Sequence, residues 1–271
     1  TVVTLQVSTG KSWKKAGKAS TDKSGRHIFL AKPLGKSANY RVKVGKKSSN
    51  ISSNAAWLTS KFTDNFSGKQ LSPVWAHRGT EPSAASGRLC SRGAPQATKV
   101  GGGAARLSVI KDRSKKSKCR GVLNGKTTGM FAYRLNGHIS TYEKMSFKYG
   151  FAAARIKMPK SQGQHGGFWL QPQDHVSGTV DPLLTGAEID VIESFGAKAG
   201  TAGSQGLSSF TYHWKLQGNG GVQVKTGGYL KNSRAALSGK GDSWSKGYHV
   251  YSVEWTPSVY IFRIDGKETR R

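Results

Sequence analysis

The chain has 271 residues and carries 43 Lys or Arg against 14 Asp or Glu, which gives a formal net charge of +29 at pH 7. No apolar run approaches the roughly 18 residues of a membrane-spanning helix, so no membrane span is expected. The charge favours contact with polyanions or a solvated lysine-rich surface, but no helix-turn-helix, zinc finger or RNP motif is present, so specific nucleic-acid recognition is not expected.

Short alternating segments, separated by clusters of Gly, Ser and Asn, run through the whole chain. No segment shows a sustained apolar period of 3.6 residues. Together with 35 glycines, this pattern predicts an all-β protein with room for one large domain and a small one.

Residues 1–58 predict a small β domain of their own. Segments 2–7, 26–30 and 40–44 alternate like the strands of an immunoglobulin-like or fibronectin-like sandwich, with a turn at 22–25. The pattern resembles accessory β domains of bacterial secreted enzymes. Too few strands fit for a complete sandwich, so we expect a partial domain that ends in a polar, Ser-rich linker at 46–54.

Three acidic residues fall in the apolar, strand-forming stretch 188–193. Alternation places Glu188 and Asp190 on one face, whereas Glu193 reaches that face only if a β-bulge absorbs one extra residue, at 191 or 192. Two carboxylates that flank a bond, one protonated and one ionised, can cleave a glycosidic linkage, and a third between them can drive their pKa values apart. The alternative is a set of solvent-facing acids on an ordinary strand.

The stretch 186–196 resembles the active-site signature of glycoside hydrolase family 16, in the laminarinase-like branch that carries E-x-D-x-x-E. Further segments resemble strands of that family in the same order: 62–68, 137–141, 147–159, 167–170, 249–257 and 264–266. The resemblance covers about residues 62–271. It implies that residues 59–271 form a concanavalin-like jelly-roll sandwich of two curved antiparallel sheets.

The resemblance also implies a role for each acid. Glu188 is the expected nucleophile, Asp190 the assisting acid and Glu193 the general acid/base of a retaining endo-β-glycosidase.

Four residues are expected to contact the substrate: Trp169, Tyr212, His213 and Trp214. For Trp169 a place in the core between the sheets stays open, and for His213 a buried, hydrogen-bonded histidine.

A β-1,3-glucan is the expected substrate, because laminarinase-like members carry the bulged motif. Two departures from the laminarinase pattern keep a galactan, an acidic polysaccharide and transglycosylation open. Gln164-His165-Gly166-Gly167 stands where a Trp-Pro pair often precedes Phe-Trp, and Ala153 stands where an acid is common. A noncatalytic carbohydrate-binding jelly roll and a basic cell-wall protein that binds polyanions are the other two classes of function.

For an exported hydrolase, Cys90 and Cys119 are expected to form one disulfide, although both could be free. No Cys-x-x-Cys motif or His cluster suggests a metal site. We therefore expect no cofactor in catalysis, and the sequence gives no indication of a structural calcium ion. The expected protein is an extracellular monomer that acts on a polysaccharide, with an anionic cell-wall polymer as a further partner for its basic surface.

The end of the chain predicts a hairpin. Residues 259–264 alternate and are followed by Asp265-Gly266, a strong two-residue turn signal. The return strand has barely begun at Arg271, and members of the family usually continue for several strands. We therefore expect the chain to be a truncated piece of a longer protein, in which a missing signal peptide says nothing against export.

Overall fold

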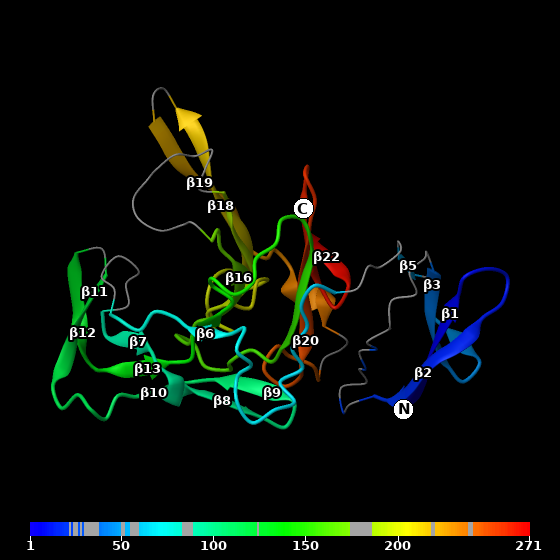
Figure 1. Ribbon diagram of the computed structural model, residues 1–271, viewed down its shortest axis with the longest axis horizontal. Coiled ribbons are helices and arrows are strands. Elements are labelled where there is room, and N and C mark those ends of the chain that lie inside the picture. Colours follow the sequence, from blue (N-terminus) through cyan, green and yellow to red (C-terminus); the bar gives the residue numbers. More distant parts are fainter. Residues whose placement is uncertain are drawn as a thin grey trace. The chain divides into compact units, whose positions relative to one another are not determined.

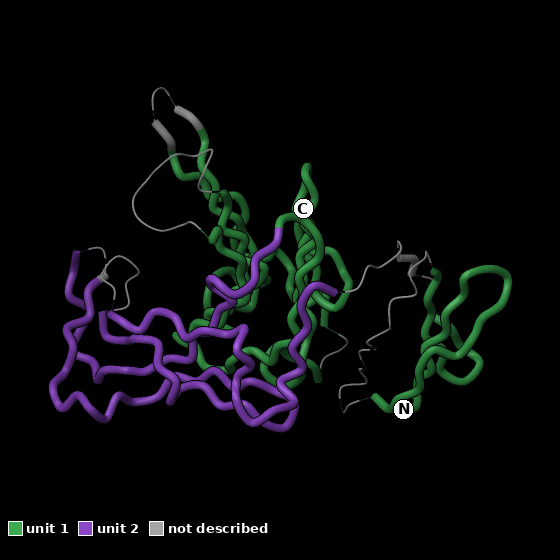
Figure 2. Tube along the Cα trace, in the orientation of Figure 1, with its two compact units in different colours: residues 1–59, 148–271 green, residues 60–147 purple. Residues whose placement is uncertain are grey.

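The computed structural model describes residues 1–21, 23, 27, 29, 38–49, 52–54, 60–82, 89–123, 125–173, 186–217, 220–237 and 241–271. The chain divides into two compact units, residues 1–59 with 148–271 and residues 60–147 (Figure 2). Within the described ranges the only helices are two short 3-10 turns, η1 (Pro95–Ala97) and η2 (Ser233–Ala236), and strands make up the other regular structure. The prediction of an all-β fold is confirmed.

The N-terminal part forms one antiparallel sheet in the order β2-β1-β3-β4, with β5 also paired to β3 (Figure 1). Its strands are β1 (Val2–Ser8), β2 (Lys14–Ser20), β3 (Ala38–Val44), β4 (Lys47–Ser48) and β5 (Ser52–Asn54). Alternation along β1 buries Val3 and Leu5, as its apolar residues predict.

The prediction that 46–54 is only a linker is wrong, because β4 and β5 in this segment pair with β3. The predicted turn 22–25 and strand 26–30 fall mostly outside the described residues. A domain boundary between residues 58 and 59 stays a prediction.

Residues 60–147 contain short strands in four small sheets: β10-β13-β7, β11-β12, β14-β6 and β8-β9. Their bounds are β6 (Ala76–His77), β7 (Ser91–Gly93), β8 (Thr98–Gly101), β9 (Ala104–Leu107), β10 (Val109–Lys111), β11 (Lys118–Leu123), β12 (Lys126–Ala132), β13 (Arg134–Asn136) and β14 (Ile139–Ser140). Cys90 and Cys119 form a disulfide with a Cα–Cα distance of 5.5 Å, which confirms the predicted bond.

The strand predicted at 62–68 is wrong. Asp64 organises this segment as a loop, because its carboxylate accepts hydrogen bonds from the Phe66 backbone N–H at 2.7 Å and from the Trp75 indole N–H at 2.8 Å. Such bonds from a side chain to nearby donors compete with the ladder of a sheet.

Residues 148–271 form two four-stranded antiparallel sheets, in the orders β15-β20-β21-β22 and β16-β17-β18-β19 (Figure 1). The strands are β15 (Gly150–Ile156), β16 (Gly166–Leu170), β17 (Glu188–Ser194), β18 (Leu207–Gln217), β19 (Gly220–Tyr229), β20 (His249–Trp255), β21 (Tyr260–Ile264) and β22 (Lys267–Arg270). The predicted hairpin at Asp265-Gly266 joins β21 to β22.

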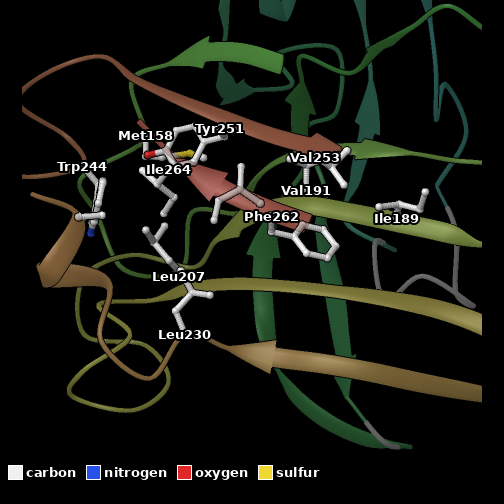
Figure 3. Packing of buried hydrophobic residues seen from close by; sticks show 12 residues of the cluster. Met158, Ile189, Val191, Leu207, Leu230, Trp244, Tyr251, Val253, Phe262 and Ile264 are labelled. Carbon is white, nitrogen blue, oxygen red and sulfur yellow. The ribbon is translucent and has the colours of Figure 1, made fainter. Parts of the chain in front are cut away.

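The core of this part lies between the two sheets and draws on both (Figure 3). Tyr251 and Val253 of β20 are fully buried there, as are Ile189 and Val191 of β17. The sheet that carries the three acids is therefore fixed by an apolar face, and its other face is left for polar chemistry.

The turn that joins β17 to β18 requires glycine at two positions. Gly196 has φ +90° and Gly206 has φ +76°, in the left-handed region that side chains rarely adopt. A Cβ at Gly206 would also collide with the carbonyl oxygen of Gly196. This close backbone approach brings the end of β17 directly against the start of β18.

Candidate active site on strand β17

Strand β17 contains a bulge between Asp190 and Glu193. Opposite it on β18, Asp190 faces Phe210 and Glu193 faces Ser208, so two residues of β17 stand against a single residue of β18. The sequence predicted an irregularity at this place, and the register confirms it.

The core side of the bulge shows how the extra residue is absorbed. Val191 is 2% exposed and Ile192 is 0% exposed, and both belong to the hydrophobic cluster. Two successive residues therefore turn to the core face. Glu193 consequently returns to the face of Glu188 and Asp190, because a regular strand would have put Ile192 there.

Asp190 has a strongly raised pKa. It is 4% exposed, and burial, followed by the negative charges of Glu188 and Glu193 and a hydrogen bond with Glu188, raises its pKa to about 8. The nearby Lys225 ammonium opposes this shift only in part. At neutral pH Asp190 is therefore mainly protonated and donates its proton to the Glu188 carboxylate.

Glu193 is held by two side chains. Its Oε1 lies 2.6 Å from His165 Nε2, and its Oε2 accepts a longer hydrogen bond of 3.4 Å from the Ser208 hydroxyl. Its side chain is 13% exposed, which leaves it in contact with solvent. Glu188 and Asp190 thus share one proton, while Glu193 has partners of its own.

Trp169 lies on the face that carries the acids. It stands opposite Asp190 on β16, whereas its neighbours Phe168 and Leu170 pack against the core. A Cβ built on Gly167 would lie 3.9 Å from Trp169 Cδ1 and 4.0 Å from Glu193 Cγ. The alternative of a core tryptophan between the sheets is therefore not what the structure shows.

Tyr212 also lies on this face. It stands opposite Glu188, and its ring is 5.2 Å from that of Phe210 in an edge-on arrangement. The Lys225 ammonium lies 3.8 Å from the centre of the Phe210 ring and 5.2 Å from that of Tyr212. Phe210 and Lys225 are therefore part of the same face, a fact that the sequence did not reveal.

The structure does not bring His213 to the acids. β18 continues without a break in its register against β19, so His213 projects from the face opposite to that of Tyr212. The expectation that His213 reaches into the cleft with the acids is therefore not what the structure shows. Trp214 has the same parity as Tyr212 and shares its face, but stands two residues further along β18 from the acids.

His165 is the principal functional candidate that the motif analysis missed. The sequence did contain an indication of its position, because residues 165, 167 and 169 alternate onto one face in an extended segment. Ser208 could have been placed only with the register of β17 against β18.

No metal cluster accompanies these acids among the described residues, where no group of three or more His, Cys, Asp or Glu side chains could hold an ion. No helix in the described part of the chain is long and apolar enough to cross a membrane.

The chain resembles known proteins in sequence and in fold. It is 31% identical over 137 residues to glucan endo-1,3-beta-glucosidase A1 of Niallia circulans, which covers 51% of this chain and 18% of that protein. It is 25% identical over 131 residues to a beta-1,3-glucan-binding protein of Penaeus monodon, which covers 48% of this chain and 33% of that protein. The chain thus spans at most about a third of the length of these two relatives.

The fold is similar to that of the laminarinase catalytic domain from Thermotoga maritima, with a TM-score of 0.52 and 18% identity over 76% of this chain and 74% of that chain. At this identity the similarity shows the fold alone. The family model for glycosyl hydrolases family 16 matches residues 105–271. Because this match takes in more than half of the residues, the chain belongs to glycosyl hydrolases family 16.

Proposed function

We propose that the face around β17 is the active site of a retaining endo-β-glycosidase that hydrolyses a β-1,3-glucan. The observation that carries this proposal is the position of Asp190, which is only 4% exposed and lies between Glu188 and Glu193 on one face of a bulged strand. Burial of a carboxyl beside two others in an apolar strand lowers stability, and such perturbed groups cluster at functional sites.

In the first step Glu188 attacks the anomeric carbon, and Glu193 gives its proton to the glycosidic oxygen as the bond to the leaving sugar breaks. In the second step Glu193 takes a proton from water, and the resulting hydroxide displaces Glu188. The product sugar keeps its β configuration. The Asp190 proton stabilises the Glu188 carboxylate when Glu188 is fully charged, which is the case before it attacks the sugar and after the product leaves it.

A β-1,3-glucan is supported by the match to a glucan endo-1,3-beta-glucosidase. The half-buried Trp169 and Tyr212, which stand opposite Asp190 and Glu188, offer apolar surface for the faces of sugar rings. An extracellular location is supported by the disulfide between Cys90 and Cys119, because such bonds persist in oxidising compartments.

The test is hydrolysis of laminarin by the chain, compared with lichenan, agarose and carrageenan. New reducing ends are measured, and proton NMR follows which anomer forms first. We expect laminarin to be the best substrate and the β anomer to appear before mutarotation. An α anomer formed first would rule out retention. Preferred cleavage of agarose or carrageenan would show that the substrate is a galactan and not a β-1,3-glucan.

A second candidate is a glucan-binding protein without catalysis, because the chain also matches a beta-1,3-glucan-binding protein. The same experiment separates the two candidates. Laminarin that binds to the chain without the release of reducing ends would favour the binding protein. Glu193→Gln serves as the control, since it should bind glucan and release no ends.

A further inference from the structure

His165 and Glu193 are in close contact on the face that carries the three acids, with 2.6 Å between Nε2 and Oε1. The His165 side chain is 39% exposed, so it does not serve as core packing. It belongs to the segment that leads into β16, whereas Glu193 belongs to β17, and the contact therefore spans two neighbouring strands.

The imidazole ring of His165 is itself held in place. It stacks on Phe195 with 4.7 Å between ring centres and 10° between ring planes. Phe195 in turn meets Tyr229 edge-on at 6.1 Å. Because Phe195 follows Ser194 at the end of β17, the ring that supports His165 and the carboxylate that His165 contacts come from the same short stretch of chain.

Phe195 is fixed by its backbone as well. Its N–H donates to the carbonyl of Gly206 at 3.0 Å, and its carbonyl accepts from the Gly163 N–H at 3.3 Å. The second bond ties the turn before His165 directly to the residue under its ring. The stack on Phe195 and these backbone hydrogen bonds thus support the orientation of His165 in addition to its contact with Glu193.

We propose that His165 is a positioning residue for Glu193, an inference that rests on the proposed glycosidase function. The short bond from His165 restrains Oε1, while the 3.4 Å contact of Ser208 restrains Oε2 only weakly. Oε2 is then the oxygen that carries the exchanging proton. It gives this proton to the glycosidic oxygen in the first step and regains one from water in the second.

A single tautomer of His165 suits both steps. With the proton on Nε2, His165 donates to Oε1 when Glu193 is ionised and still does so when Glu193 carries its proton on Oε2. The Glu193 carboxyl therefore need not rotate between the step in which it acts as an acid and the step in which it acts as a base. A fixed donor in this place reduces the freedom that must be lost on the way to the transition state.

Two substitutions separate the hydrogen bond from the stacking. His165→Phe keeps an aromatic ring against Phe195 and removes the N–H donor, whereas His165→Gln keeps an N–H donor and removes the ring. Gln164→Ala is the matched control, since Gln164 is an exposed neighbour of His165 whose backbone N–H donates to the Ser161 carbonyl, a bond that the substitution keeps. Thermal melting of each variant verifies that it is folded.

Two substrates distinguish an effect on proton donation by Glu193 from a general loss of activity. Laminarin has a sugar hydroxyl as leaving group and needs protonation, whereas a 2,4-dinitrophenyl glycoside of a β-1,3-gluco-oligosaccharide does not. Comparison of kcat/KM confines the measurement to steps up to cleavage of the first bond. For His165→Phe we expect a loss of about tenfold or more on laminarin and less than about threefold on the dinitrophenyl glycoside.

His165→Gln should recover part of the loss on laminarin, and Gln164→Ala should match the wild type on both substrates. Equal losses on the two substrates, or no loss on laminarin, would overturn the positioning role while leaving the glycosidase intact. If the wild-type chain cleaved neither substrate, the proposed function would fall first, and the role of His165 with it.

Discussion

Val191 and Ile192 are neighbours in the sequence, yet both bury their side chains in the core between the two sheets, with exposed fractions of 2% and 0%. In a regular strand, successive side chains point to opposite faces. The pair therefore marks the extra residue of the bulge, and it rotates the end of β17 so that Glu193 joins Glu188 and Asp190. Hydrophobic packing on one face thus sets the arrangement of the three acids on the other.

Substitution of the two outer acids should show which one is the nucleophile. Glu188→Ala and Glu193→Ala are each expected to lower kcat/KM for laminarin by about three orders of magnitude or more, because each removes a group that makes or breaks a bond. Sodium azide with a dinitrophenyl substrate then distinguishes them. Azide should give an α-glycosyl azide with Glu188→Ala, where it replaces the nucleophile, and a β-glycosyl azide with Glu193→Ala, where it replaces water.

The opposite assignment of the two azide products would exchange the roles of the two residues. A Glu188→Ala variant that kept more than about a tenth of the activity without azide would contradict a nucleophilic role altogether. Melting temperatures close to that of the wild type serve as the control for folding.

Asp190→Asn should change the pH dependence of stability. With a pKa of about 8 in the folded chain against 3.8 for the free group, Asp190 stays protonated in the fold over a pH range in which the unfolded chain has lost this proton. Its contribution to the free energy of unfolding therefore falls as the pH rises from about 4 to about 8, by at most about 1.4 kcal/mol per pH unit. The variant has no such proton and should gain stability relative to the wild type over this range.

Urea unfolding of both proteins at several pH values from 4 to 9 measures this difference, in which the other titrating groups largely cancel. A difference that stayed constant between pH 4 and 8, or that first grew above pH 8, would contradict the burial of a protonated Asp190. Activity should fall less in Asp190→Asn than in either Glu variant, since Asp190 breaks no bond itself.

The sequence predicted those features that depend on local alternation. The bulge followed from the count of residues between Asp190 and Glu193, and the last hairpin from Asp265-Gly266, whose φ angles of +49° and +79° suit such a turn. In each case the information lies within a few residues of the feature itself.

Contacts between segments were beyond the reach of the same reasoning. The stack of His165 on Phe195 joins residues whose proximity only the pairing of β16 with β17 determines. The loop around Asp64 depends on donors up to eleven residues away. His213 was assigned by resemblance to the family, and the parity of β18, counted from Tyr212, contradicts that assignment.

Loss of the disulfide should lower the stability of the part that contains it. The bond between Cys90 and Cys119 closes a loop with a sequence separation of 29 residues. Constraint of the unfolded chain by such a loop contributes about 3 to 4 kcal/mol on the chain-entropy model. The double variant Cys90→Ala/Cys119→Ala should unfold at a correspondingly lower urea concentration, and wild type reduced with dithiothreitol should match it. Identical unfolding curves for oxidised and reduced wild type would show that the bond adds nothing.

Trp169 and Phe168 are adjacent on β16 and face opposite ways, which makes them a matched pair for separating substrate binding from folding. Trp169→Ala removes apolar surface beside Asp190 and should raise KM for laminarin by about tenfold or more, with little change in the free energy of unfolding. Phe168→Ala removes a ring packed against the core and should lower that free energy by about 2 to 4 kcal/mol, while KM of the folded enzyme stays near the wild-type value. Steady-state kinetics and urea unfolding of both variants make the comparison. If Trp169→Ala lost stability as Phe168→Ala does and left KM unchanged, Trp169 would be a structural residue, and the surface for the sugar would have to lie with Tyr212 instead.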